Sequence, residues 1–155
     1  MSEKIYDSRN CCETYEIGRL TGKTLCKGDV VAIYGELGSG KTVLAKGIAA
    51  GLGLSTDVTS PTYTFINAYG EPVLMYHMDM YRICHPEEAE EIGFQEYLSD
   101  ECVCVIEWAE RVEELLPETR TDIWIVKDAE KGEGYRRITV TGRSGNESTG
   151  CQHVF

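Results

Sequence analysis

The feature that most constrains this chain is a glycine-rich loop between an apolar run and a helical pattern. The apolar run covers residues 30–34 (Val-Val-Ala-Ile-Tyr), the loop is Gly35-Glu36-Leu37-Gly38-Ser39-Gly40-Lys41-Thr42, and the helical pattern covers residues 43–50. This is the spacing G-x-x-x-x-G-K-[ST] with a strand before it and a helix after it. A glycine-rich turn that binds nothing is the alternative. The complete pattern in the required context favours a phosphate-binding loop, and therefore a nucleoside triphosphate as ligand.

Each residue type in this loop suits phosphate. Glycines let the backbone curl so that successive N–H groups point at phosphate oxygens, and the positive end of the next helix favours an anion. Lys41 can reach the β- and γ-phosphates, and the Thr42 hydroxyl can hold Mg²⁺. The residues expected to contact the nucleotide are Glu36, Leu37, Gly38, Ser39, Gly40, Lys41, Thr42, Val43 and, further along the chain, Asp79.

Composition describes an ordinary globular protein. The 155 residues are 42% hydrophobic and 26% charged, which suits one domain with a full core. We expect that domain to span residues 1–142, and the polar segment 143–155 to be a flexible tail.

The net charge is −11, with 26 acidic and 15 basic residues, and no basic cluster exceeds the pair Arg136-Arg137. Direct binding to DNA or RNA is therefore not expected, because it depends on Lys and Arg neutralising phosphates.

The sequence shows no targeting signal and no cysteine motif. The N-terminus has no basic-then-apolar pattern, and no apolar run approaches the length of a membrane helix, so a cytoplasmic location without membrane contact is expected. The seven cysteines are odd in number and include no C-x-x-C pair. They indicate neither a zinc site nor a disulfide framework, and we expect reduced thiols.

The remaining pattern predicts alternating helices and strands. Ile17 and Leu20 suggest a helix before residue 27, and Leu44, Ile48 and Leu52 form one buried stripe. Further elements are expected as strands 62–66 and 73–79 in an antiparallel hairpin, a helix from Pro86, strand 102–107, helix 108–116, and strands 123–126 and 137–140. The predicted fold is α/β: a P-loop NTPase-like three-layer sandwich whose mixed sheet has an antiparallel hairpin portion.

A phosphate loop needs a second acid for the metal, and two strand ends offer one. Asp79 and Glu107 each follow an apolar strand, and ligands of parallel sheets collect at such carboxyl ends. Glu107 ends the more apolar strand, so it is favoured for Mg²⁺, directly or through water. Asp79 then orients the attacking water or contacts the γ-phosphate or Mg²⁺ from further out. The alternative for each is an acid that caps the next helix or is merely solvated.

Four further positions are candidates for a switch or a partner contact. Ser60 and Thr62 flank Pro61 where related folds carry a loop that senses the γ-phosphate, although a plain turn is equally compatible. Arg82 can contact phosphate, a partner or Asp79. Trp108 is either a core residue or an aromatic that moves with nucleotide state. His77, on a predicted strand, is more typical of a packed histidine than of a catalytic one.

Taken together, these blocks resemble the TsaE (YjeE) family of small bacterial ATPases, which serve threonylcarbamoyladenosine modification of tRNA. The motif His-x-Asp-x-Tyr-Arg followed by Ile-Glu-Trp is much more specific than the phosphate loop alone. The matching blocks lie in the family's order over about residues 14–142: Gly35–Thr42, Ser60-Pro61-Thr62-Tyr63, His77-Met78-Asp79-Met80-Tyr81-Arg82, Gly93–Leu98, and Ile106-Glu107-Trp108 with Leu116-Pro117. Departures are mild: Glu36, Ser39 and Met80 stand where Asp, Ala and Leu are common.

The resemblance implies a function and its residues. It implies ATP binding by Lys41 and the loop backbone, Mg²⁺ binding by Thr42 and Glu107, and nucleotide contact and hydrolysis by Asp79, so that Lys41, Asp79 and Glu107 are the expected catalytic residues. It implies a switch-like loop at 60–62 and a functional aromatic at Trp108. The partners it implies are TsaD and TsaB, with tRNA held only indirectly and ATP hydrolysis resetting their complex between turnovers.

Three other functions compete with this one. A small-molecule kinase needs a substrate domain or an Arg-rich lid, for which the chain has little room. A GTPase lacks its Asn-Lys-x-Asp segment here. A nucleotide-gated adaptor without required hydrolysis stays open on the sequence alone.

Overall fold

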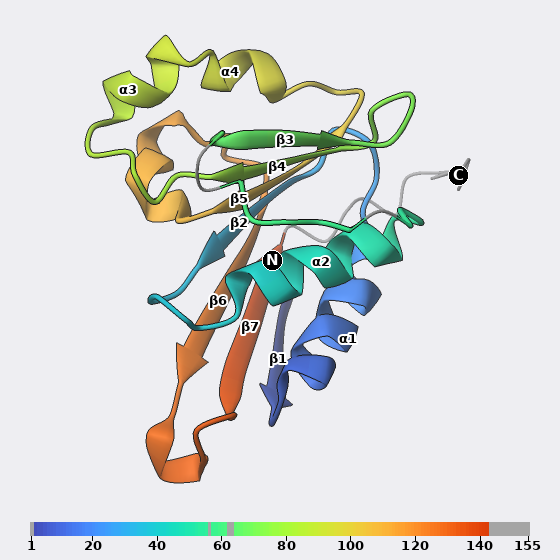
Figure 1. Cartoon of the computed structure of the whole chain (residues 1–155), viewed down its shortest axis with the longest axis vertical. Helices are drawn as coiled ribbons and strands as arrows, with labels where there is room; N and C mark the ends of the chain where they lie inside the picture. The colour runs from blue at the N-terminus through green and yellow to red at the C-terminus, as the bar shows by residue number, and fades with distance from the viewer. Residues whose placement is uncertain (1, 56, 62–63, 143–155) are drawn as a thin grey trace.

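A computed structural model describes residues 2–55, 57–61 and 64–142, and Figure 1 shows its elements. The strands are β1 (Ser2–Ser8), β2 (Val30–Tyr34), β3 (Ile66–Tyr69), β4 (Met75–Asp79), β5 (Val103–Glu107), β6 (Thr121–Lys127) and β7 (Arg136–Gly142). The α-helices are α1 (Cys11–Gly22), α2 (Lys41–Gly51), α3 (Pro86–Glu91) and α4 (Phe94–Tyr97), and the 3-10 helices are η1 (Ala109–Leu115) and η2 (Ala129–Lys131).

The described strands form one mixed sheet in the order β1-β7-β6-β2-β5-β4-β3. Its centre is parallel, since β2 runs parallel to β5 and β6, and β5 runs parallel to β4. Its margins are antiparallel, with β3 on β4, β7 on β6 and β1 on β7. The predicted α/β fold with an antiparallel hairpin portion is confirmed, and β3–β4 is that hairpin.

Helices cover both faces of the sheet, and the sheet separates the core into two clusters. Helices α1 and α2 lie on one face, and α3, α4 and η1 lie over the other (Figure 1). Strand β2 serves both halves, because successive side chains of a strand point to opposite faces. Val31 and Ile33 pack in the cluster with Leu44 and Ile48 of α2. Alternate β2 residues pack in the second cluster, which explains why this strand is an unbroken apolar run.

Three local features differ from the sequence expectations. Strand β1 was not predicted, because its residues are polar and mostly exposed at the sheet margin. The strand expected at 62–66 begins only at Ile66 and continues to Tyr69, while residues 62 and 63 lie outside the described part. The helix expected at 108–116 is a 3-10 helix that bends at Val112, whose side chain is buried in the second core cluster.

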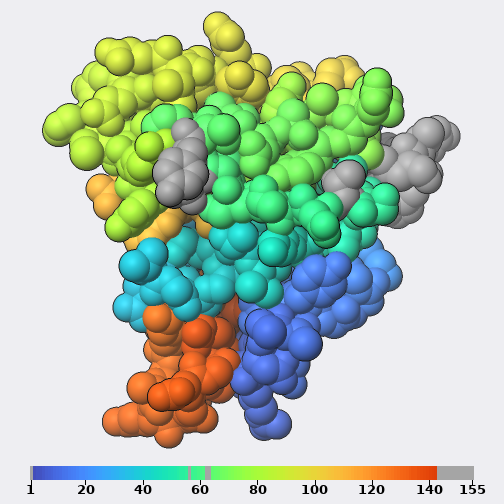
Figure 2. Space-filling view, viewed as in Figure 1, coloured from blue at the N-terminus to red at the C-terminus, as the bar shows by residue number. Residues whose placement is uncertain are grey.

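Glycines let α1 and α2 touch through their backbones. An added Cβ at any of these glycines meets a carbonyl oxygen of the other helix at 2.1–2.3 Å, far inside contact distance: Gly18, Gly22, Gly47 and Gly51. The four sites alternate across one seam, two on each helix, so the helix that begins at the phosphate loop is seated against α1 without intervening side chains. In the space-filling view the blue atoms of α1 lie directly against the teal atoms of α2 (Figure 2).

The structure bears on two expectations, that the cysteines are reduced and that no helix spans a membrane. Of the six described cysteines, Cys26 is disulfide-bonded and the other five are free thiols. The expectation of reduced thiols is therefore wrong at Cys26. Among residues 2–55, 57–61 and 64–142, no helix has the length and apolar character needed to cross a bilayer.

Gly47→Ala should destabilise the fold. Alanine favours a helix over glycine by about 1 kcal/mol, but the new methyl would lie 2.1 Å from the Tyr15 carbonyl oxygen. Overpacking of this kind outweighs the helical gain, and we expect a net loss of about 2 kcal/mol. Urea unfolding followed by circular dichroism measures it. Lys46→Ala, at an exposed position of the same helix, is the control and should change stability by less than about 0.5 kcal/mol. A Gly47→Ala protein as stable as that control would contradict the close backbone contact of α1 and α2 at this position.

Candidate functional site

The loop between β2 and α2 has the backbone that glycine permits. Gly38 and Gly40 have φ values of 73° and 104°, a region that side chains with a Cβ disfavour. Gly40 is also the residue that caps α2. A Cβ at Gly35 would lie 2.6 Å from Ser39 Oγ and 2.8 Å from the Ile125 carbonyl oxygen. The glycines of the predicted phosphate loop therefore stand where the backbone requires them.

Lys41 points back across this loop. Its Nζ donates to the carbonyl oxygens of Gly35 at 2.6 Å and Glu36 at 2.8 Å, and it lies 4.1 Å from the centre of the Trp108 ring. The side chain is buried, and this burial lowers the pKa of the ammonium, opposed by nearby carboxylates, first that of Glu107. An anionic ligand would stabilise the charged form of such a buried ammonium.

Thr42 and Glu107 meet at the first turn of α2. The Thr42 hydroxyl donates to Glu107, with Oγ1 3.0 Å from Oε1 and 3.1 Å from Oε2. His77 Nε2 lies 2.7 Å from the same Oε1, and both His77 and Glu107 are almost fully buried. The expectation of a packed histidine is confirmed, but its partner is the carboxylate favoured for the metal.

Asp79 lies on the neighbouring strand at the same level. It is the register partner of Glu107, so the parallel pairing brings both strand-end acids to one edge of the sheet. Asp79 Oδ2 accepts from Ser60 Oγ at 3.1 Å, and Oδ1 accepts from the Tyr81 N–H at 2.9 Å. Ser60 is therefore attached to this acid, while Thr62 lies outside the described residues.

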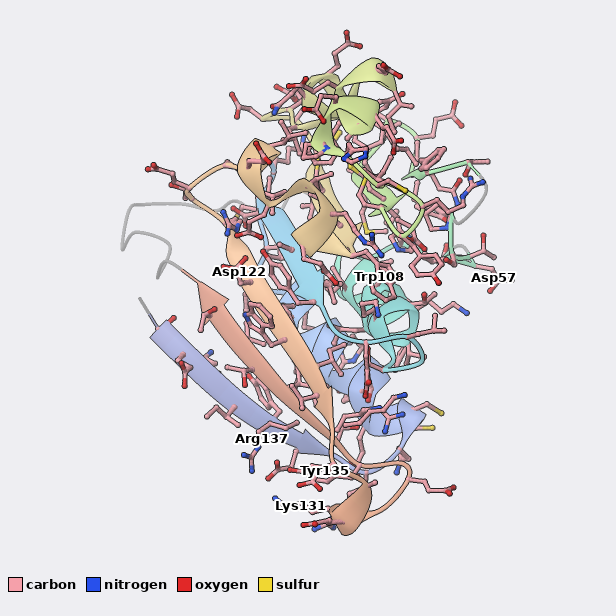
Figure 3. All side chains as sticks on the ribbon, turned by 90° about the vertical axis from the view of Figure 1, so that its left-hand side faces the viewer. Asp57, Trp108, Asp122, Lys131, Tyr135 and Arg137 are labelled. Carbon is pink, nitrogen blue, oxygen red and sulfur yellow. The ribbon has the colours of Figure 1, made fainter. Side chains whose placement is uncertain are left out.

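These residues line one cavity of about 450 Å³. Trp108 forms part of its wall, with a left-handed backbone (φ 56°) and its ring 4.8 Å from that of Tyr81. Figure 3 shows Trp108 in the middle of the molecule beside the start of α2. The full lining is Leu37, Gly38, Ser39, Gly40, Lys41, Thr42, Val43, Ser60, Asp79, Tyr81, Glu107 and Trp108.

Two predicted site residues have different surroundings. The Glu36 side chain is exposed and lies 3.9 Å from Lys127 Nζ, although its backbone carbonyl holds Lys41. Arg82 places its guanidinium 4.6 Å from the centre of the Phe65 ring. Neither is among the described residues that line the cavity.

Sequence reasoning missed three residues of this neighbourhood. Tyr81 lines the cavity, and its place two residues after Asp79 was the available signal. Lys127 and Arg136 donate to carbonyls of the phosphate loop. No local signal marks them, because they are more than 80 residues away in sequence and reach the loop only through the pairing of β6 and β7.

The donor set fits Mg²⁺ as P-loop proteins bind it. Oxygen ligands suit this ion, which keeps several waters and takes most other ligands from phosphates. Thr42 and Glu107 supply a hydroxyl and a carboxylate already in contact. Among the described residues, no cluster of three or more His, Cys, Asp or Glu side chains could hold a metal by itself.

Comparison with known proteins gives consistent matches over most of the chain. The model of the family described as "Threonylcarbamoyl adenosine biosynthesis protein TsaE" matches residues 8–138. The tRNA threonylcarbamoyladenosine biosynthesis protein TsaE of Bacillus subtilis is 41% identical over 143 residues, covering 92% of this chain and 87% of the relative. The protein of the same name from Treponema pallidum is 42% identical over 133 residues, covering 86% and 96%.

A solved structure shares the fold. The crystal structure of Bacillus subtilis YdiB superposes with a TM-score of 0.73 at 37% sequence identity, covering 91% of this chain and 86% of that one. The family match includes the phosphate loop, both strand-end acids and Trp108. By sequence and by fold, this chain belongs to the TsaE family.

Proposed function

We propose that this protein is a Mg²⁺-dependent ATPase subunit that supports threonylcarbamoyladenosine modification of tRNA. It works through a complex of TsaD- and TsaB-type partners, and hydrolysis of ATP resets that complex between turnovers. The observation that carries the proposal is the contact of Thr42 with Glu107 beside Lys41 at the start of α2, in a chain of the TsaE family. The names of its relatives point to the tRNA modification.

Nucleotide binding follows from charge and dipoles around the loop. Lys41 has a lowered pKa because of burial, and a phosphate at the cavity replaces lost hydration with an anionic partner. The N-terminus of α2 adds a positive field. Mg²⁺, when bound, neutralises part of the phosphate charge. Thr42 and Glu107 are the residues that would hold it.

Asp79 is the residue best placed for water. It lines the cavity with Glu107 beside it on the next strand, and contacts from Ser60 and Tyr81 fix its carboxylate. In hydrolysis, the oxygen of water bonds to the γ-phosphorus, and the bond from that phosphorus to the oxygen bridging the β- and γ-phosphates breaks. A proton of the water is released to solvent, and ADP and phosphate leave. Asp79 orients that water.

Partner stimulation is part of the proposal. Lys41 is the one cationic side chain among the described residues that line the cavity, and phosphoryl transfer gains greatly from an arginine placed in or delivered to the site. A slow enzyme that partners accelerate is the expected result. The net charge of −11 suits a subunit that leaves tRNA to its partners.

The decisive experiment measures ATP turnover by the purified protein alone, with TsaD–TsaB complex, and with complex and tRNA. Strong stimulation by the complex supports the proposal. A rate independent of partners, with no complex formed, contradicts it and directs attention to phosphate transfer onto small metabolites. Complex formation gated by nucleotide without turnover points instead to an adaptor.

Lys41→Ala should abolish nucleotide binding or turnover. The variant loses the buried ammonium that faces the cavity, and we expect at least about a hundredfold weaker ATP affinity or rate. Calorimetry and a phosphate-release assay measure the two quantities. Lys46→Ala, on the exposed side of the same helix, is the matched control. Unchanged kinetics in Lys41→Ala would remove the basis of the assignment.

Glu107→Ala and Asp79→Ala should impair different steps, metal-dependent nucleotide binding and hydrolysis. Loss of Glu107 should weaken Mg²⁺-dependent nucleotide affinity by about tenfold or more, whereas loss of Asp79 should mainly slow hydrolysis, by about a hundredfold. Calorimetry with and without Mg²⁺, combined with turnover rates, separates the two effects. Glu114→Ala, at an exposed position, is the control. A larger metal-dependent affinity loss in Asp79→Ala would reverse the two roles.

A further inference from the structure

Two cations outside the cavity hold the outer side of the phosphate loop. Arg136 Nε donates to the Ser39 carbonyl oxygen at 2.8 Å, and its Nη2 donates to that of Gly38 at 3.3 Å. Lys127 Nζ donates to the Leu37 carbonyl oxygen at 3.0 Å. Three consecutive carbonyls of the loop are thus engaged by side chains of the β6–β7 hairpin, far from the loop in sequence.

The origin of the two cations makes this arrangement unusual. Lys127 and Arg136 are register partners across β6 and β7, and like charges directly opposite each other destabilise a sheet. The loop carbonyls that both side chains contact offset this repulsion. Arg136 also donates to the carbonyls of Glu133 and Tyr135, each at 2.8 Å. Its guanidinium is therefore held by backbone oxygens of the hairpin on one side and of the loop on the other.

Fixing a carbonyl also fixes an amide. In a trans peptide the C=O of one residue and the N–H of the next point in opposite directions. Holding the Leu37 and Ser39 carbonyls therefore aims the N–H groups of Gly38 and Gly40 away from the two cations. Both glycines line the cavity, and both have the positive φ that a curled loop needs.

We propose that Arg136 and Lys127 are positioning residues of the phosphate loop, which orient its amides for phosphate before nucleotide arrives. The proposal rests on the proposed function for its ligand, a nucleotide phosphate, but the loop order that it describes exists without ligand. Preorganised donors bind an anion without the cost of ordering them. The two positive charges add to the field at the loop.

The chain supplies a matched control in the next residue. Arg137 follows Arg136 on the same strand, so its side chain points to the opposite face of the sheet. It is half exposed, and its Nε lies 3.8 Å from Asp7 Oδ1. Arg137→Gln removes the same charge from the same strand without touching the loop.

The first test is hydrogen exchange in the ligand-free protein. Arg136→Gln should speed exchange of the amides at 38–42 by about tenfold, the equivalent of one charged hydrogen bond, while Arg137→Gln leaves them at wild-type rates. Urea unfolding should stay cooperative in both variants, and the stability of Arg136→Gln should fall by no more than the loss of one charged hydrogen bond. Equal exchange at 38–42 in wild type and Arg136→Gln would overturn the proposal, whether or not the protein binds nucleotide.

The second test is ADP affinity with Mg²⁺, measured by calorimetry. Arg136→Gln should bind about tenfold more weakly than wild type. Arg136→Lys should recover part of that affinity through its charge but not the amide protection, since one ammonium does not reproduce the planar fork. Turnover at saturating ATP should change less than KM. An equal loss of affinity in Arg137→Gln would mean that net charge alone acts, against positioning. If wild type binds no ADP, the proposed function fails, and the exchange rates alone decide the role of Arg136.

Discussion

The candidate site depends on the parallel pairing of three central strands. Pairing β4 with β5 sets Asp79 opposite Glu107, and pairing β5 with β2 brings both acids beside the loop that leaves β2. Every strand in this group ends at the same edge, so side chains 28 residues apart in sequence share one cavity. A single residue of slip between β4 and β5 would turn one carboxylate to the opposite face, since side chains alternate along a strand.

Local charge, rather than net charge, sets the electrostatic environment of the phosphate loop at this edge of the sheet. The chain carries −11 overall, yet Lys41, Lys127 and Arg136 all contact carbonyls of the phosphate loop. At physiological salt the Debye length is about 8 Å, so charges in direct contact with the loop act on a phosphate there more strongly than exposed acids farther away. A net charge of −11 is therefore compatible with the nucleotide site proposed above.

Sequence reasoning reached the parts of the molecule that local pattern encodes. The loop, the buried β2 run and the strand-end acids each carry their own signal, and the TsaE resemblance followed from short motifs. Strand β1 escaped because a marginal strand needs few apolar residues. The contact of Arg136 with the phosphate loop was not predicted, because it depends on how β7 pairs with β6. The partner of His77 likewise came from tertiary packing, since a strand pattern indicates burial but not which polar atom lies opposite.

The glycine seam between α1 and α2 has a consequence for how this sequence can change over time. Where two side chains meet in a core, a larger residue on one side can be matched by a smaller one on the other. At Gly18, Gly22, Gly47 and Gly51 the opposing atom is a backbone carbonyl, which no substitution can shrink. Relatives that keep this helix spacing have no compensating exchange available, and those that lose a glycine must move α2, and the phosphate loop with it.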